Sequence, residues 1–91
     1  MKTLPSGVAY YARSPKFSDQ SIPENLLDSH RTKTMTWANI VVTQGRILYR
    51  ILEPRIEEHE LSPDRSGVVE PQVPHELEVM GDVRFHLEFY R

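Results

Sequence analysis

Four histidines carry most of the chemistry that this sequence offers: His30, His59, His75 and His86. Neutral imidazoles combined with a carboxylate form a common donor set for zinc, nickel, iron or manganese. The side chains must point into one cavity, so the strand face of each histidine decides its use. His59 lies in the acidic segment EEHE and is expected to be solvated. The chain has no cysteine, which excludes disulfides and thiolate ligation.

His75 belongs to the stretch VVEPQVPHELE, and it alternates with Leu77 and Val79. This alternation turns the imidazole inward, either as a metal ligand or as a core histidine bonded to a backbone carbonyl. Glu70 lies five residues earlier, across a segment with two prolines that must turn. A turn there brings Glu70 toward the cavity as a further ligand, or leaves it as an exposed carboxylate on the rim.

His30 lies in the polar stretch DSHRTKTMTW, just before the strongest strand. A residue that enters a barrel at this point can reach a ligand from a late strand, so His30 is the expected counterpart of His75. Lys33 then lies near the mouth, where its charge can attract a small anion or substrate. Arg31 has the same opportunity, although a solvated loop cation is the simpler interpretation.

His86 depends on the register of the last predicted hairpin. A two-residue turn at Gly81 and Asp82 places it in the cavity with His75, whereas a three-residue loop with a bulge reverses the faces. Burial of each large apolar side chain contributes roughly 1.5 to 3 kcal/mol, more than the preference for one turn. We therefore choose the second register and keep His86 as an alternative metal ligand. This choice buries Val83, Phe85, Leu87 and Phe89.

The elements that must position these residues are short β-strands separated by proline and glycine. The segment GVAYYAR is the first predicted strand, and Pro23 starts a short helical turn. Residues 36–43 and 46–52 form a predicted hairpin around Gln44-Gly45, where glycine supplies a positive φ. The segment RIEEHELS reads as an edge strand, and Gly67–Val69 as another. A last hairpin joins residues 75–80 to residues 83–90, which makes an antiparallel all-β fold.

Composition limits the classes of function. The chain has 91 residues and is expected to form a single domain over residues 1–91. Its net charge of −2 comes without a polybasic block, which disfavours nucleic-acid binding. No apolar run is long enough for a signal peptide or a membrane span, so a cytoplasmic protein is expected. A core this small favours a homodimer.

Three segments, HRTKTMTWANIVVTQGRILYRIL, VVEPQVPHELE and FHLEFYR, give the chain a recognisable pattern. It resembles the small cupin family related to the amino-terminal domain of the tellurite-resistance protein TehB. The resemblance implies a small antiparallel cupin-type jelly-roll barrel, often dimeric, that holds a divalent metal. The paired cupin histidines are reduced to His30-Arg31-Thr32, and Ala38 stands where a glutamate is expected. The residues that carry the resemblance are His30, Lys33, Trp37, Gly45, Glu70, Pro71, Gln72 and His75.

The expected function follows from these assignments. The leading hypothesis is a metal-binding cupin that binds or senses a divalent metal or small oxyanion, with His30, His75 and Glu70 as ligands. One alternative is a metal-dependent hydrolase or oxygenase that uses Glu70 as general base and Lys33 to stabilise charge. Another is a metal-free dimerisation domain. Full-length TehB carries a methyltransferase domain, but this sequence has no glycine-rich nucleotide motif, so methyl transfer is not expected.

Overall fold

The computed structural model describes residues 1–27 and 30–91. Its strands are β1 (Tyr10–Arg13), β2 (Phe17–Ser18), β3 (Trp37–Ile51), β4 (Glu57–Leu61), β5 (Gly67–Val69) and β6 (His75–Tyr90). The 3-10 turn η1 (Glu24–Leu26) lies at the predicted helical turn and buries Leu26. No α-helix occurs among the described residues, and the predicted antiparallel all-β character is confirmed.

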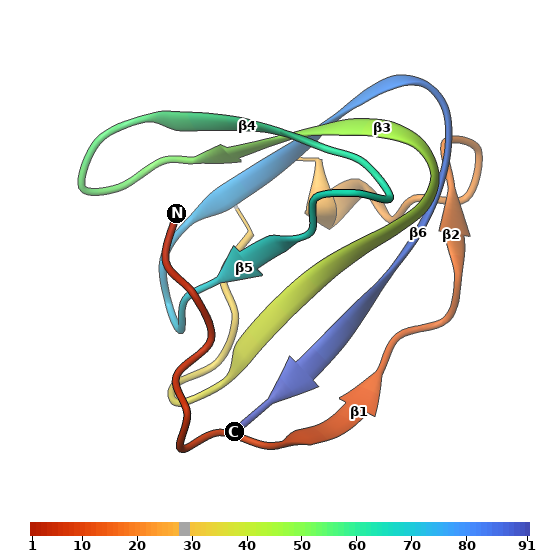
Figure 1. Cartoon of the computed structure of the whole chain (residues 1–91). Coiled ribbons are helices and arrows are strands. Elements are labelled where there is room, and N and C mark those ends of the chain that lie inside the picture. The colour runs from red at the N-terminus through yellow and green to blue at the C-terminus, as the bar shows by residue number, and fades with distance from the viewer. Residues whose placement is uncertain (28–29) are drawn as a thin grey trace.

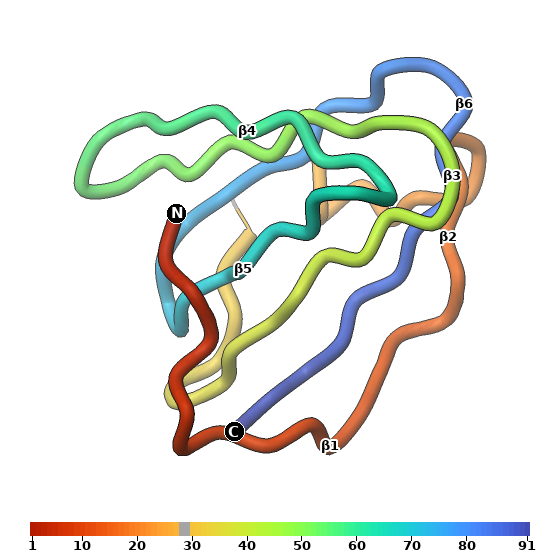
Figure 2. Tube along the Cα trace, viewed as in Figure 1, coloured from red at the N-terminus to blue at the C-terminus, as the bar shows by residue number. Residues whose placement is uncertain are grey.

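Two long strands form the centre of the molecule. β3 and β6 pair antiparallel over nearly their whole length, from Trp37 opposite Tyr90 to Ile51 opposite His75. The other edge of β3 pairs first with β5 and then with β4, while β1 and β2 flank the second half of β6. Both long strands curve together, so the upper part of the sheet folds over the lower part (Figures 1 and 2).

The two predicted hairpins are wrong. Gln44-Gly45 lies inside the continuous strand β3, and Gly81-Asp82 lies inside the continuous strand β6. Gly45 has φ 79° as expected, but it sits opposite Val83 between two shifts of register. A Cβ on Gly45 would lie 2.0 Å from the carbonyl oxygen of Asp82. Glycine is therefore required here for close approach of β6 at a bulged bend. The same bend passes through Gly81, where φ is 101°.

The core lies on the inner face of the folded sheet. Ile47, Tyr49 and Ile51 are buried as the alternation predicts. Arg50 lies on the opposite face, where its guanidinium donates to Glu58 at 2.8 Å and contacts two further glutamates. The large side chains that are most completely buried are Tyr49, Phe85, Ile40, Ile47, Leu61, Val69 and Val83. These side chains hold the two halves of the sheet together through burial of apolar surface.

The sheet does not close within the described residues. Its order is β1-β6-β3-β4, with β2 beside β1 on β6 and β5 beside β4 on β3, so these four short strands form the two edges. β4 is the predicted edge strand, and its acidic side chains suit that position. The expected cupin-type jelly-roll barrel is therefore not confirmed. The predicted hairpin turns at Gly45 and Gly81 are bends within the two long strands β3 and β6. Among the residues described, no helix is long and apolar enough to cross a membrane.

Candidate functional site

His30 and His75 lie side by side, as the sequence predicts. The His30 backbone N–H donates to the His75 carbonyl at 2.7 Å, and the His75 N–H donates to the His30 carbonyl at 2.9 Å. The two rings meet edge to face, with centroids 5.3 Å apart. This bridge fastens the segment before β3 to the start of β6, so residues that follow His30 in sequence are held beside the late strand.

His75 is a core histidine. Its exposed fraction is 4%, and its ring packs edge to face on Tyr49 with centroids 5.8 Å apart. Nδ1 lies 3.2 Å from the Val73 carbonyl oxygen, which can only accept, so Nδ1 carries the proton. Burial lowers the pKa of His75, which favours the neutral ring. The alternative of a histidine satisfied by a backbone carbonyl is thus confirmed.

Lys33 and Arg31 line the same pocket as His30. The cavity has a volume of about 310 Å³, and its lining combines cations with hydroxyl groups and two aromatic side chains. Arg31 donates to the Gln72 carbonyl at 3.0 Å and approaches Glu53 at 3.9 Å, so its charge is partly neutralised. Burial lowers the pKa of His30. The lining residues are Tyr11, Ala12, His30, Arg31, Thr32, Lys33, Thr36 and Phe89.

Tyr11 and Phe89 also line this pocket, and no pattern in the sequence predicts their contribution. Tyr11 lies at an irregularity in the pairing of β1 with β6, between Tyr10 and Ala12. A bulge of this kind turns a side chain to a new direction. Phe89 comes from the end of β6 and is predicted to lie in the core. It is half-buried, and its side chain packs against the core and also lines the pocket. The pocket therefore joins both ends of the chain to the segment after His30.

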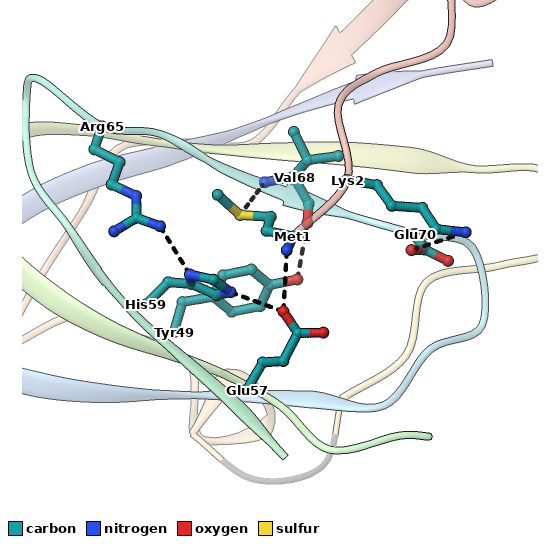
Figure 3. A network of polar contacts seen from close by, with 8 residues as sticks. All are labelled: Met1, Lys2, Tyr49, Glu57, His59, Arg65, Val68 and Glu70. Carbon is teal, nitrogen blue, oxygen red and sulfur yellow. Dashed lines mark hydrogen bonds and ion pairs between the residues drawn. The ribbon is translucent and has the colours of Figure 1, made fainter. Parts of the chain in front are cut away.

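Glu70 does not join the histidines. Its carboxylate lines a different pocket, where it lies 3.6 Å from the ammonium group of Lys2. The segment between Glu70 and His75 turns, as the prolines require, but Glu70 directly follows β5 and its carboxylate pairs with Lys2 (Figure 3). Thr32 reaches only the Glu70 backbone, with a hydroxyl to carbonyl distance of 3.3 Å.

His86 lies on the face of β6 opposite Phe85, although the hairpin from which this was predicted does not form, and it is only 7% exposed. Its Nε2 is 3.1 Å from Glu88 Oε2, so it forms a local pair away from His75. The predicted burial of Val83 and Phe85 is confirmed, with 1% exposure each. His59, expected to be solvated, is half-buried between Glu57 and Arg65.

Within residues 1–27 and 30–91, the structure contains no group of three or more histidine or acidic side chains placed to hold a metal ion. His30 and His75 are adjacent, but Glu70 faces another pocket and His86 another surface. What the geometry defines is a small antiparallel β-domain with a cation-lined pocket.

The comparisons place this domain in a family. The family model described as the TehB-like domain matches residues 12–87, and the chain belongs to that family. Two curated relatives, from Haemophilus influenzae strains 10810 and ATCC 51907, are named probable S-adenosyl-L-methionine-dependent methyltransferase TehB. Each is 30% identical over 76 residues, covering 79% of this chain and 27% of the relative. The chain thus spans about a quarter of these relatives.

Solved structures agree with this placement. The crystal structure of TehB from Haemophilus influenzae matches with a TM-score of 0.84 and 28% identity, over 93% of this chain and 32% of that one. A structural-genomics crystal structure of a protein from Escherichia coli strain K12 matches with a TM-score of 0.88 and 18% identity. That match covers 100% of this chain and 97% of the other, and it concerns the fold alone.

These findings correct the predicted function. The expectation of a metal-binding cupin that senses a divalent metal is wrong, because the described residues hold no ligand group and the named relatives are methyltransferases. Zinc, nickel, iron or manganese is likewise not the cofactor that the relatives' names indicate; those names specify S-adenosylmethionine. The physical reason for the error is the direction of Glu70, which the proline turn sends to a second pocket.

Proposed function

We propose that this TehB-like domain is an accessory domain for S-adenosylmethionine-dependent methyl transfer, and that it binds a small anionic ligand in the pocket around Lys33. In this proposal the domain holds the anion that accepts the methyl group, while the transfer itself takes place on a methyltransferase. The domain contributes binding and orientation and carries out no covalent step.

The observation that supports the proposal is the lining of the 310 Å³ pocket. Lys33 and Arg31 supply two fixed positive charges, and His30 supplies a third when it is protonated. The hydroxyl group of Thr36 adds a neutral donor to the same lining, whereas the Thr32 hydroxyl already donates to the Glu70 carbonyl. Cations with convergent donors recognise small anions, and charge-assisted hydrogen bonds are stronger than neutral ones.

The family supports the connection with methyl transfer. The relatives named as S-adenosylmethionine-dependent methyltransferases share this domain over 76 residues. A domain that occurs beside such chemistry is well placed to bind the methyl acceptor. We assign the acceptor to the class of small anions because the pocket charge is positive, and we leave the choice between an inorganic oxyanion and a carboxylate to experiment.

Isothermal titration calorimetry at low ionic strength tests the proposal with sodium tellurite, sodium acetate and sodium chloride as probes. Lys33→Ala should weaken binding of the preferred anion by about tenfold, the value of one partly exposed charged contact. Lys16→Ala is the matched control, because Lys16 and Arg84 line a separate pocket of about 310 Å³ with three hydroxyl side chains. Equal losses for the two variants, or no binding of any probe, would refute the proposal.

A further inference from the structure

The pocket around Lys33 has two walls of opposite character. The polar wall comes from the segment 30–36, which precedes β3. The other wall combines Tyr11 and Ala12 from β1 with Phe89 from the end of β6, so it contains two aromatic side chains and a methyl group. β1 pairs with β6 at this point, with Ala12 opposite Phe89. The lining of the proposed anion site therefore continues into an apolar surface.

This pocket is much larger than an inorganic oxyanion. Its volume is about 310 Å³. An oxyanion of four heavy atoms takes the space of about two to three water molecules, roughly 60 to 90 Å³ at about 30 Å³ each. A cavity of about 150 Å³ already holds a benzene ring. The pocket therefore has room for an aromatic ring with an attached carboxylate, and its volume lies at the lower end of the range for small-molecule sites, about 300 to 1,000 Å³.

One end of the polar wall is fixed by Gln72, which lies in the turn between β5 and β6. Its φ of 61° is a left-handed conformation that residues with a side chain disfavour. The Gln72 carbonyl accepts the Arg31 guanidinium at 3.0 Å, and the Gln72 N–H donates to the Thr32 carbonyl at 3.3 Å. These bonds hold Arg31 and Thr32 in place before any ligand binds.

The other end of the polar wall is fixed by a turn at Met35, whose φ is 64°. The turn is closed by the Thr36 N–H, which donates to the Lys33 carbonyl at 3.0 Å. Of the residues that the structure describes, Met35 and Gln72 are the two besides glycine with a positive φ, and both adjoin the lining of this pocket. Strained backbone of this kind gathers at ligand sites. A polar wall that is already fixed lowers the entropy cost of binding a ligand.

The apolar wall is supported from outside the pocket. Arg91 exchanges two backbone hydrogen bonds with Ala9, at 3.0 and 3.1 Å, and its guanidinium carbon lies 4.1 Å from the centroid of the Tyr11 ring. Arg91 does not line the pocket, so the pocket meets the uncovered face or the edge of that ring. Either presentation suits a second aromatic ring, because aromatic pairs favour offset stacking and edge-to-face contact.

We propose that the pocket around Lys33 takes an aromatic monocarboxylate of about the size of benzoate, with its carboxylate at Lys33 and its ring against Tyr11 and Phe89. This inference rests on the proposed anion site and names the class of anion that the site selects. Arg31 already approaches Glu53 at 3.9 Å, so Lys33 is the main counter-ion, and one cation matches one carboxylate. Acetate or an inorganic oxyanion would leave the apolar wall in water, whereas an aromatic ring covers it.

Calorimetry on the whole chain at low ionic strength tests the proposal with sodium benzoate, sodium acetate and benzyl alcohol as probes. Benzoate should bind about tenfold more tightly than acetate, because its ring adds apolar burial and aromatic contacts. Benzyl alcohol has the ring without the charge and should bind about tenfold more weakly than benzoate. Acetate or benzyl alcohol that binds as tightly as benzoate overturns the ligand class. Acetate binding that depends on Lys33 would leave the proposed anion site standing, whereas no binding of either carboxylate overturns both.

Two variants on the same strand locate the ring of the ligand. Tyr11→Ala should remove most of the tenfold preference for benzoate and leave the affinity for acetate unchanged. Tyr10→Ala is the matched control, because the Tyr10 ring packs edge to face on Tyr90, with centroids 5.9 Å apart, and does not line the pocket. This control should keep the full preference for benzoate. Equal preferences in the two variants overturn the placement of the ring.

If Tyr11→Ala does not fold, NMR spectra of the unmodified chain provide the test. The ring current of bound benzoate should shift the methyl signal of Ala12, which lies between the two aromatic side chains in the lining sequence of the apolar wall. Acetate has no ring and should leave that signal almost in place. An Ala12 methyl signal that benzoate does not move, or that both anions move equally, contradicts the proposal.

Discussion

Acidification should destabilise this domain through His75. Its ring is 4% exposed, and burial lowers its pKa below the ordinary value of 6.5. Because the folded pKa is lowered, the unfolded chain binds more protons, and the free energy of unfolding falls as the pH falls. The free energy of unfolding therefore has its full value with respect to His75 above pH 6.5, and it decreases progressively below that pH. One such group removes up to about 1.4 kcal/mol per pH unit until the folded pKa is reached.

Urea unfolding followed by tryptophan fluorescence measures this effect at about pH 7.5 and about pH 5.5, which brackets the ordinary histidine pKa. The unmodified protein should lose about 1 kcal/mol more between the two pH values than His75→Gln, which has no ring to protonate. His59→Gln retains His75 and should show the loss of the unmodified protein. The reasoning is refuted if His75→Gln loses as much stability on acidification as the unmodified chain.

Three further changes test the packing and the assembly. Gly45→Ala should cost about 2 to 4 kcal/mol, because φ is 79° and the new Cβ meets the Asp82 carbonyl at 2.0 Å; Gly7→Ala, with open space around it, is the neutral control in the same urea series. Phe85→Ala should cost about 3 to 5 kcal/mol, since the ring is 1% exposed in the core, and a loss below about 1 kcal/mol contradicts that placement. The homodimer expected from the small core remains a prediction, and a monomer mass in light scattering at all concentrations would refute it.

The sequence predicts the strands better than their connections. Alternation of apolar residues correctly identified the buried face of β3 at Ile47, Tyr49 and Ile51. The glycine at position 45 was correctly expected to have a positive φ, but a hairpin turn and a bulge require the same backbone angle. The partner strand distinguishes the two cases, and local sequence carries no information on that partner. The same mistake, a bend in a continuous strand predicted as a hairpin turn, occurs at Gly81.

The candidate site shows the same limit. His75 was placed inward because two residues on the same strand share its face, and that is a local property. Glu70 is predicted to share a metal site with His75 across a proline turn. The direction of the Glu70 side chain, however, depends on how β5 pairs with β3. Tyr11 and Met1 reach their pockets from the amino-terminal segment, whose path follows from long-range contacts. No periodicity in the sequence encodes those contacts.

Amide-resolved NMR during a titration with sodium tellurite, repeated with sodium acetate, tests the proposed function most directly. An anion in the Lys33 pocket should shift the signals of residues 11–12, 30–33, 36 and 89, which line it. The signals around Lys16 and Arg84 report on the separate cationic pocket and should stay in place. Shifts confined to that second pocket, or spectra unchanged by both anions, would contradict the account.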